Sequence, residues 1–219
     1  KKFKIEELRD ILENKKISLE NENKDILTLK IEDTNRADLL SVEGIARELK
    51  GILGKEKGIP NYKIERNSFM VKIDPKVKKV RPYTACCVVK NLKFDDFSIQ
   101  QIIQLQEKLT DTFGKKRKEA AIGIYDFDKI KWPITYTTFK PESLSFQPLG
   151  MIEKLNLKQI LEKHEKGKEY AHLLKDHSEY PIFIDANEEV LSMPPIINSD
   201  YSGKVTEKVG ELTKSIGDT

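Results

Sequence analysis

Apolar positions recur every three or four residues in four stretches of the chain, which is the spacing of an amphipathic helix. These stretches are residues 5–12, 34–54, 98–114 and 157–164. Thr34 or Asn35 suits the N-cap of the second helix, and Ser98 suits that of the third. Gly54 and Gly114 follow the last apolar positions of these two helices, so we expect the helices to end there.

Other stretches alternate between apolar and polar residues or are continuously apolar, as strands are. Residues 81–92, "RPYTACCVVKNL", are apolar enough to predict a central strand. "YPIFID" and "EEVLSM" read as a hairpin across the turn "ANE". Further strands are predicted at 25–31, 67–74, 120–127 and 132–139.

The order of these elements predicts an α+β fold, because the strands are not separated by regular helices. Residues 54–63 contain two glycines and a proline without periodicity, which indicates a domain boundary. We expect a small N-terminal α/β domain over 1–58, followed by a larger mixed domain over 59–206. The latter would have a β-sandwich-like core flanked by helices. Residues 207–219 are expected to be a tail or the start of the next segment.

Composition narrows the classes of function. The chain of 219 residues is 38% hydrophobic and 34% charged, which is polar but compatible with a folded core. Its net charge of +3 comes from 39 basic and 36 acidic residues, so only local clusters would attract nucleic acid. Adjacent Cys86 and Cys87 predict buried free thiols. No signal-like start and no long apolar run is present, so we expect a cytoplasmic protein without membrane contact.

The third predicted helix carries the first candidate for chemistry. Gln106 falls near the centre of its apolar stripe, and Glu107 lies at the edge. A buried amide without partners costs about 1 to 3 kcal/mol. Gln106 is therefore either satisfied by a strand backbone or faces a wet pocket, and the pattern leaves both open.

The basic run "KKRK", residues 115–118, follows this helix. It is either a solvated helix end, favoured by the helix dipole, or a phosphate-binding patch in which Arg117 supplies a bidentate fork. His164, His172 and His177 have a spacing that suits no common zinc site, so we expect surface or loop positions and no metal.

The segment "VLSMPPIINS", residues 190–199, has no charge. Pro194 keeps Met193 extended, and the two prolines end the strand because they donate no ladder hydrogen bonds. Ser192 and Asn198 then flank a stiff apolar bend. The bend is either a hydrophobic turn at the domain edge or the wall of a small-molecule pocket.

Four long segments together resemble the beta subunit of phenylalanyl-tRNA synthetases of the archaeal and eukaryotic type, in its N-terminal part. They are "DTNRADLLSVEGIAREL", "QLQEKLTDTFGKKRKEAAIGIYDFDKI", "EKGKEYAHLL" and "VLSMPPIINSDYSGKVT". The resemblance extends to about Thr206. It implies an editing domain that hydrolyses tyrosine wrongly attached to tRNA(Phe), and it places the synthetic active site elsewhere in the enzyme.

The resemblance also implies roles for individual residues. Three would act on the ester or the terminal adenosine as catalytic residues: Gln106, Glu107 and Asn198. Five would bind the substrate: Arg117, Leu149, Phe183, Ser192 and Lys204. Ser192 would recognise the tyrosine hydroxyl. The ester is reactive enough for a positioned water and a polarised carbonyl to suffice, with Glu107 or a ribose hydroxyl orienting the water.

Three positions depart from the family's pattern. Phe183 replaces an aliphatic residue and would narrow the pocket, and Lys204 replaces an arginine. After Thr206 the family continues with an "FIDVTG"-like strand whose Asp and Thr also face the tyrosine, whereas this chain reads "EKVGELTKSIGDT". Either the two residues are lacking here or a stretch of sequence is skipped. Phe183 and this divergent tail support an alternative, a non-catalytic tRNA-binding or scaffold module of the synthetase.

The resemblance implies the following cofactors and partners. The fragment itself needs no cofactor, whereas the full synthetase uses ATP and magnesium. The expected partners are the 3′ end of tRNA(Phe) and the alpha subunit, in a heterotetramer of two alpha and two beta subunits. The sequence is thus expected to be part of a longer protein.

Overall fold

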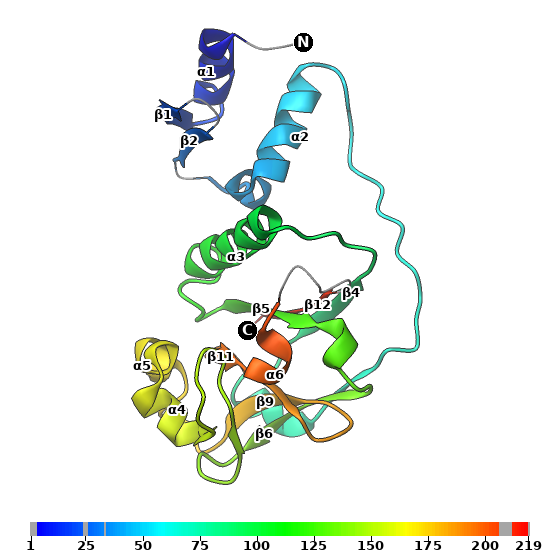
Figure 1. Ribbon diagram of the computed structural model, residues 1–219, viewed down its shortest axis with the longest axis vertical. Helices are drawn as coiled ribbons and strands as arrows, with labels where there is room; N and C mark the ends of the chain where they lie inside the picture. Colours follow the sequence, from blue (N-terminus) through cyan, green and yellow to red (C-terminus); the bar gives the residue numbers. More distant parts are fainter. Residues whose placement is uncertain (1–3, 24–25, 33, 206–211, 219) are drawn as a thin grey trace. The chain divides into compact units, whose positions relative to one another are not determined.

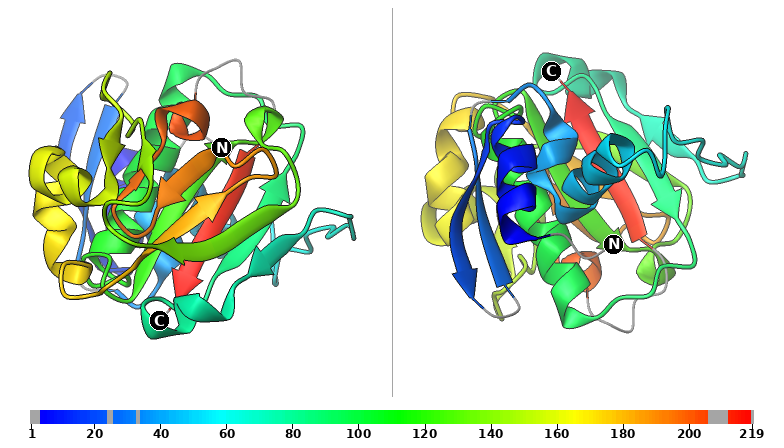
Figure 2. Two further views of the ribbon diagram at one scale, coloured as in Figure 1. Left: turned by 90° about the horizontal axis from the view of Figure 1, so that it is seen from below. Right: turned by 90° about the horizontal axis from the view of Figure 1, so that it is seen from above.

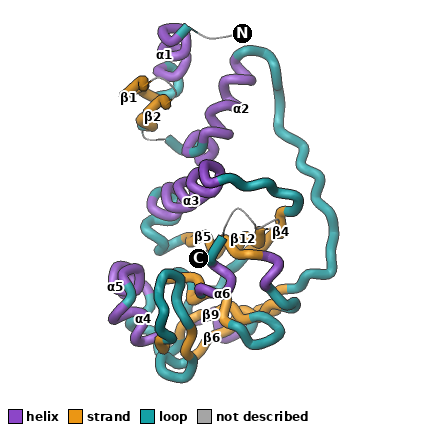
Figure 3. The backbone as a smooth tube through the Cα atoms, viewed as in Figure 1, coloured by secondary structure: helices purple, strands orange, loops and turns teal. Residues whose placement is uncertain are grey.

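The computed structural model describes residues 4–23, 26–32, 34–205 and 212–218, the last range by its backbone alone. The chain divides into two compact units, Lys1–Tyr62 and Lys63–Thr219. Between the last helix of the first unit and the first strand of the second, the chain forms a loop (Figure 3). The boundary that we predict at residue 58 lies in this loop.

The described residues of the first unit form two α-helices, a hairpin and a short 3₁₀ helix (Figure 1). Its elements are α1 (Ile5–Glu13), β1 (Ile17–Asn23), β2 (Ile26–Ile31), η1 (Ala37–Leu40) and α2 (Val42–Ile52). β1 and β2 pair antiparallel. The buried side chains at the centre of this unit come from α1, β1 and η1, namely Leu12, Ile17 and Leu39.

The start of α2 differs from the prediction. Neither Thr34 nor Asn35 caps it. Instead, Ser41 is the N-cap, and its hydroxyl accepts a hydrogen bond of 3.0 Å from the backbone N–H of Gly44. The N-cap lies later in the sequence than predicted because the separate 3₁₀ helix η1 occupies residues 37–40. The helical spacing of apolar residues therefore begins before α2 itself.

The second unit holds two larger sheets. The first has the order β11-β10-β9-β6-β3, in which only β3 and β6 are parallel. Its strands are β3 (Val71–Ile73), β6 (Ile134–Phe139), β9 (Tyr180–Ile184), β10 (Val190–Met193) and β11 (Ile197–Asn198). The predicted hairpin is confirmed as β9 and β10, which pair antiparallel.

The second sheet has three antiparallel strands in the order β4-β12-β5, which are β4 (Ala85–Val89), β12 (Leu212–Asp218) and β5 (Ala120–Asp126). The prediction of a central strand at 81–92 is wrong, since β4 lies at the edge. The prediction of buried thiols is also wrong, because Cys87 is exposed and Cys86 only half-buried. Residues 212–218 are the middle strand, whereas the sequence suggests a tail or a new segment there.

Helices and short elements complete the second unit. They are η2 (Pro75–Lys79), α3 (Asp96–Asp111), η3 (Phe127–Lys129), β7 (Ser145–Phe146), β8 (Leu155–Asn156), α4 (Leu157–Lys163), α5 (Glu165–Tyr170), η4 (Ala171–Leu173) and α6 (Asp200–Gly203). Asp95, and not Ser98, is the N-cap of α3. Ser98 is the N3 partner in a reciprocal capping box, because the sequence offers two capping side chains three residues apart.

Buried residues join the two sheets into one layered structure. Tyr125 of β5 packs in one cluster with residues of the other sheet and its connections, namely Val77, Ile130, Ile134, Tyr136, Phe183 and Leu191. This arrangement is the predicted β-sandwich-like core, and the α+β class is confirmed. Figure 2 shows α4 and α5, in yellow, to one side of the sheets.

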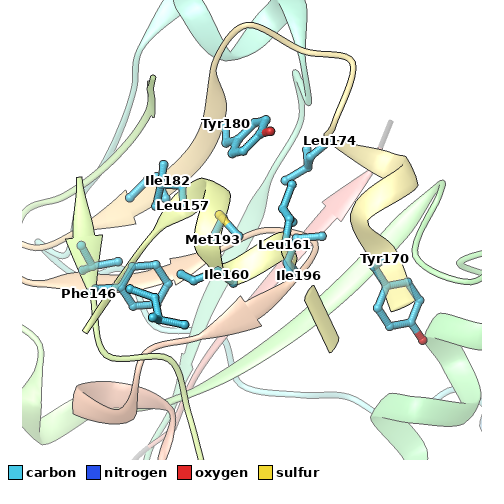
Figure 4. Packing of buried hydrophobic residues seen from close by; sticks show 12 residues of the cluster. Phe146, Leu157, Ile160, Leu161, Tyr170, Leu174, Tyr180, Ile182, Met193 and Ile196 are labelled. Carbon is cyan, nitrogen blue, oxygen red and sulfur yellow. The ribbon is translucent and has the colours of Figure 1, made fainter. Parts of the chain in front are cut away.

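A second cluster lies between α4, α5 and the five-stranded sheet. Figure 4 shows Met193 of β10 and Ile196 among side chains of α4 and β9, including Leu157, Ile160 and Ile182. All five of these side chains are at least 99% buried. The uncharged segment 190–199 is therefore anchored in this core by the residues on either side of its two prolines.

Candidate functional site

A cavity of about 130 Å³ lies beside the bend at residues 194–197. Every residue from Ser192 to Asn198 lines it, and β5 contributes Ala121, Gly123 and Tyr125. Six of the eight predicted site residues line it as well: Gln106, Arg117, Leu149, Phe183, Ser192 and Asn198. The pattern left open whether this bend is an edge turn or a pocket wall, and the structure makes it both, since β11 is also the edge strand of its sheet.

Hydrogen bonds hold the bend in place. The backbone N–H of Ile196 donates to the carbonyl of Met193 at 2.8 Å, which closes a tight turn around the cis peptide bond between Pro194 and Pro195. From the other side, Arg117 Nη1 donates to the carbonyl oxygens of Pro195 at 3.0 Å and Ile196 at 2.7 Å. The bend is a fixed wall because its otherwise unpaired carbonyls are satisfied by one guanidinium.

The basic run 115–118 does not form a uniform patch. Lys115 pairs with Glu119, while Lys116 and Lys118 are exposed. Arg117 turns inward, and its guanidinium carbon lies 4.2 Å from the ring centroid of Tyr170.

The backbone around Arg117 is unusual. Lys115, Lys116 and Arg117 have φ angles of 47°, 53° and 67°, a left-handed conformation that costs non-glycine residues free energy. The contacts of Arg117 with the bend and with Tyr170 offset that cost. Since one cation is directed inward and three are not, the run is partly a solvated helix end and partly a wall of the site.

The inner end of the cavity carries a pair of buried hydroxyls. Tyr125 Oη donates to Ser192 Oγ at 2.7 Å, and the two residues are 4% and 1% exposed. Next to them, the rings of Phe183 and Tyr136 stack with centroids 4.4 Å apart. Burial raises the pKa of the Tyr136 phenol well above its usual range, so this group stays neutral. The inner end is thus aromatic, with uncharged hydroxyls.

A second cavity of about 300 Å³ shares a wall with the first. Gln106, Leu149 and Asn198 line both, and the second cavity adds apolar residues of α3, namely Ile99, Ile102 and Ile103. Lys204 lines the second cavity only. The side chain of Gln106 makes no hydrogen bond with the described residues, which favours the pocket interpretation of this amide over the structural one.

Asn198 is positioned from two directions. Its side-chain Nδ2 donates to the backbone carbonyl of Ile124 at 3.1 Å, and its own backbone carbonyl oxygen accepts from the N–H of Leu149 at 2.9 Å. A Cβ added at Gly203 would lie 2.5 Å from the Cβ of Asn198, so the first turn after β11 can pack this closely only with glycine. Asn198 is therefore a rigid amide at the junction of the two cavities.

The remaining predicted residues lie elsewhere. Glu107 is exposed on α3 and lines neither cavity, so the structure does not bring it together with Gln106 and Asn198. His172 is exposed as predicted. His164 is half-buried as the N-cap of α5, with Nδ1 accepting from the N–H of Lys166 and Nε2 3.2 Å from the carbonyl of Leu149.

The described ranges of the chain contain no group of three or more His, Cys, Asp or Glu residues that could hold a metal ion. None of their helices is long and apolar enough to cross a membrane.

The sequence pattern did not point to Tyr125 and Tyr136, which line the first cavity, and it indicated Arg81, which lines it as well, only as part of a weak basic cluster. Arg81 lies in a short cluster with Lys78 and Lys79, yet it is 5% exposed and accepts at its carbonyl from the Tyr136 hydroxyl at 2.9 Å. A signal for Tyr125 was present in the alternation of β5. Gly123 and Tyr125 share a face, and a glycine two residues before a large ring leaves room for that ring to fold back.

Comparison with known proteins agrees with this architecture. No family model matches the chain. The sequence is 49% identical over 208 residues to the phenylalanine–tRNA ligase beta subunit of Pyrococcus horikoshii, and 48% identical over 210 residues to that of Thermococcus onnurineus. These matches include 93% and 94% of this chain, but 37% and 36% of the relatives. The chain thus spans somewhat more than a third of the length of the curated relatives.

The structure is similar to that of an N-terminal fragment of the phenylalanyl-tRNA synthetase beta subunit from Pyrococcus horikoshii. The TM-score is 0.93 at 45% identity, over 100% of this chain and 64% of that one. The fold and the sequence matches place the chain in the class of aminoacyl-tRNA ligase subunits. Within that class it belongs to the phenylalanine–tRNA ligase beta-subunit family and corresponds to the N-terminal part, so the resemblance seen in the sequence is confirmed.

Proposed function

We propose that this part of the protein edits mischarged tRNA by hydrolysing the ester that joins tyrosine to tRNA(Phe). The observation that carries the proposal is a cavity with a buried, uncharged hydroxyl pair at its inner end, Tyr125 and Ser192, which opens beside a second cavity. Such a site offers a partner to a phenol and none to a plain phenyl ring.

The size of the first cavity supports an aromatic side chain as its ligand. An engineered protein cavity of roughly 150 Å³ binds benzene, and the cavity here is about 130 Å³. Phe183 and Tyr136 supply aromatic surface against which a ring can pack. Although Phe183 narrows this space, the cavity still suits one six-membered ring.

Discrimination would follow from the Ser192 hydroxyl. Because Ser192 is 1% exposed, phenylalanine in the cavity would leave the proton of this hydroxyl without an acceptor, whereas the phenolic oxygen of tyrosine would accept it. Sites built to bond a substrate hydroxyl reject the analogue without it by about 10⁴ to 10⁵ fold. Correctly charged tRNA would then escape hydrolysis.

The second cavity suits the terminal adenosine of the tRNA, with its apolar wall from α3 against the base and Lys204 near the phosphates. The ester would then lie at the shared wall, where Gln106 and Asn198 polarise its carbonyl by hydrogen bonds. A water oriented by a neighbouring ribose hydroxyl completes the hydrolysis. Glu107 has no role in this mechanism, because its exposed side chain lines neither cavity.

The whole enzyme would supply the remaining functions. We propose that the chain acts within a phenylalanine–tRNA ligase together with an alpha subunit, and that the synthetic site with its ATP and magnesium lies outside this part. Its nucleic-acid partner is the 3′ end of tRNA(Phe). Editing itself needs no cofactor in the mechanism above.

A deacylation assay on the intact ligase tests the proposal. Tyr-tRNA(Phe) should be hydrolysed much faster than Phe-tRNA(Phe), and Ser192→Ala should reduce that preference. Equal background rates for the two substrates with the wild-type enzyme would contradict editing. Such a result would favour a tRNA-binding or scaffold module. The main support for that alternative is Phe183, which narrows the cavity.

A further inference from the structure

The contact between Tyr125 and Ser192 connects the two sheets of the second unit. Tyr125 belongs to β5 of the three-stranded sheet, and Ser192 belongs to β10 of the five-stranded sheet. The two oxygens are 2.7 Å apart, and both side chains are at least 95% buried. A hydrogen bond of this length in the interior fixes the orientation of both hydroxyls.

The direction of this hydrogen bond decides what Ser192 has left to offer. A phenol is a stronger acid than an aliphatic alcohol, so Tyr125 donates and Ser192 Oγ accepts. The proton of Ser192 then points away from Tyr125. Ser192 Oγ donates to no acceptor among the described residues, and Ser192 lines the cavity.

We infer that Tyr125 is a positioning residue for substrate specificity: it orients Ser192 so that the serine proton is presented to an oxygen atom of the ligand in the cavity. The ligand class is an aminoacyl ester with a phenolic side chain, whose oxygen accepts that proton. This inference rests on the proposed editing function and assigns a role to a residue that touches Ser192 and acts through it.

The local sequence is built for this arrangement. A Cβ added at Gly123 would lie 2.4 Å from Tyr125 Oη, so the phenol ring lies back across Gly123 on the same face of β5. Any larger residue at this position would displace the phenol from Ser192. The glycine and the tyrosine therefore act as one unit that places a hydroxyl at the inner end of the cavity.

The test is the preference of the intact ligase for Tyr-tRNA(Phe) over Phe-tRNA(Phe) in deacylation. Tyr125→Phe should lower this ratio about tenfold, which is the loss expected for one oriented hydrogen bond. Tyr180→Phe is the matched control, because Tyr180 is equally buried at 4% exposure, lies in a different core cluster and has a hydroxyl that makes no hydrogen bond with the described residues. For Tyr180→Phe, the ratio of the two deacylation rates should stay at the wild-type value.

A double-mutant cycle separates positioning from general damage. If Tyr125 acts through Ser192, Tyr125→Phe should change the ratio little in a Ser192→Ala background, whereas a merely structural effect would persist there. Should Tyr125→Phe fail to fold, Gly123→Ala displaces the same hydroxyl and should lower the ratio in the same way.

The possible results separate this inference from the function on which it rests. A wild-type ligase without any preference for the tyrosyl ester defeats the editing proposal. If the wild-type ligase shows the preference and Tyr125→Phe leaves it intact, the role of Tyr125 alone is overturned. The same holds if Tyr125→Phe lowers the preference equally with and without Ser192.

Discussion

Replacing Arg117 by methionine tests whether the bend at 194–197 is held by a single guanidinium. The change removes two charge-assisted hydrogen bonds, to Pro195 and Ile196, and the contact with the ring of Tyr170. Such hydrogen bonds contribute about 1.5 to 3 kcal/mol each, and a cation over a ring about 0.5 to 1 kcal/mol. Both bonds share Nη1, and fixing a long side chain costs up to about 2 kcal/mol, so we expect a net loss of about 2 to 3 kcal/mol.

Urea unfolding measures this loss directly. With a slope of about 2 kcal/mol per molar urea, the midpoint of the second unit should fall by about 1 to 1.5 M. Lys116→Met is the matched control, because Lys116 is the adjacent cation with the same left-handed backbone but an exposed side chain. Its midpoint should hardly move, and an unchanged midpoint for Arg117→Met as well would refute the assignment of Arg117 as the support of the bend.

Three further predictions follow from single contacts. Gly203→Ala brings a methyl group 2.5 Å from Cβ of Asn198, so deacylation of Tyr-tRNA(Phe) should slow at least tenfold, and a wild-type rate would remove Asn198 from the site. Lys204→Met should raise KM about equally for tyrosyl and phenylalanyl esters, because Lys204 lines only the second cavity, and it should make KM less dependent on salt. A changed ratio of the two deacylation rates would contradict this placement of Lys204. Hydrogen bonds from Lys15 and then Arg36 lower the pKa of Glu48, so the stability that they add is present above about pH 4.5 and is lost as the pH falls through the lowered pKa. Calorimetry between pH 3 and 6 should show this loss, less than about 1 kcal/mol because the pair is partly exposed, and Glu48→Gln should remove it.

Local patterns predicted the fold where local physics decides it. The helical spacing located α1, α2, α3 and α4, and the alternation of 180–193 located the hairpin of β9 and β10. Strand order is a different matter, because it depends on pairing between segments far apart in the sequence. Residues 85–89 look central by composition, yet they form an edge strand because residues 212–218 insert between them and β5.

The candidate site shows the same division. Ser192 and Asn198 were recognisable because two prolines isolate them in an uncharged bend, and Gln106 was recognisable as an amide within an apolar stripe. Tyr125 was not, because a tyrosine in an apolar strand is ordinarily core. Its importance arises from a contact with a residue 67 positions away, and periodicity along one strand carries no information about that contact.

The two cavities explain why the segment 190–199 has no charge. A charged group beside Ser192 would attract water and any polar ligand, so it would weaken selection by one phenolic oxygen. Among the described residues, the cations that line the first cavity are Arg81 and Arg117, and Nη1 of Arg117 is bonded to the carbonyls of Pro195 and Ile196. Lys204 lines the other cavity. The buried hydroxyls thus belong to the first cavity and Lys204 to the second, and Gln106 and Asn198 lie at the boundary, where the ester of the proposed substrate would join its two halves.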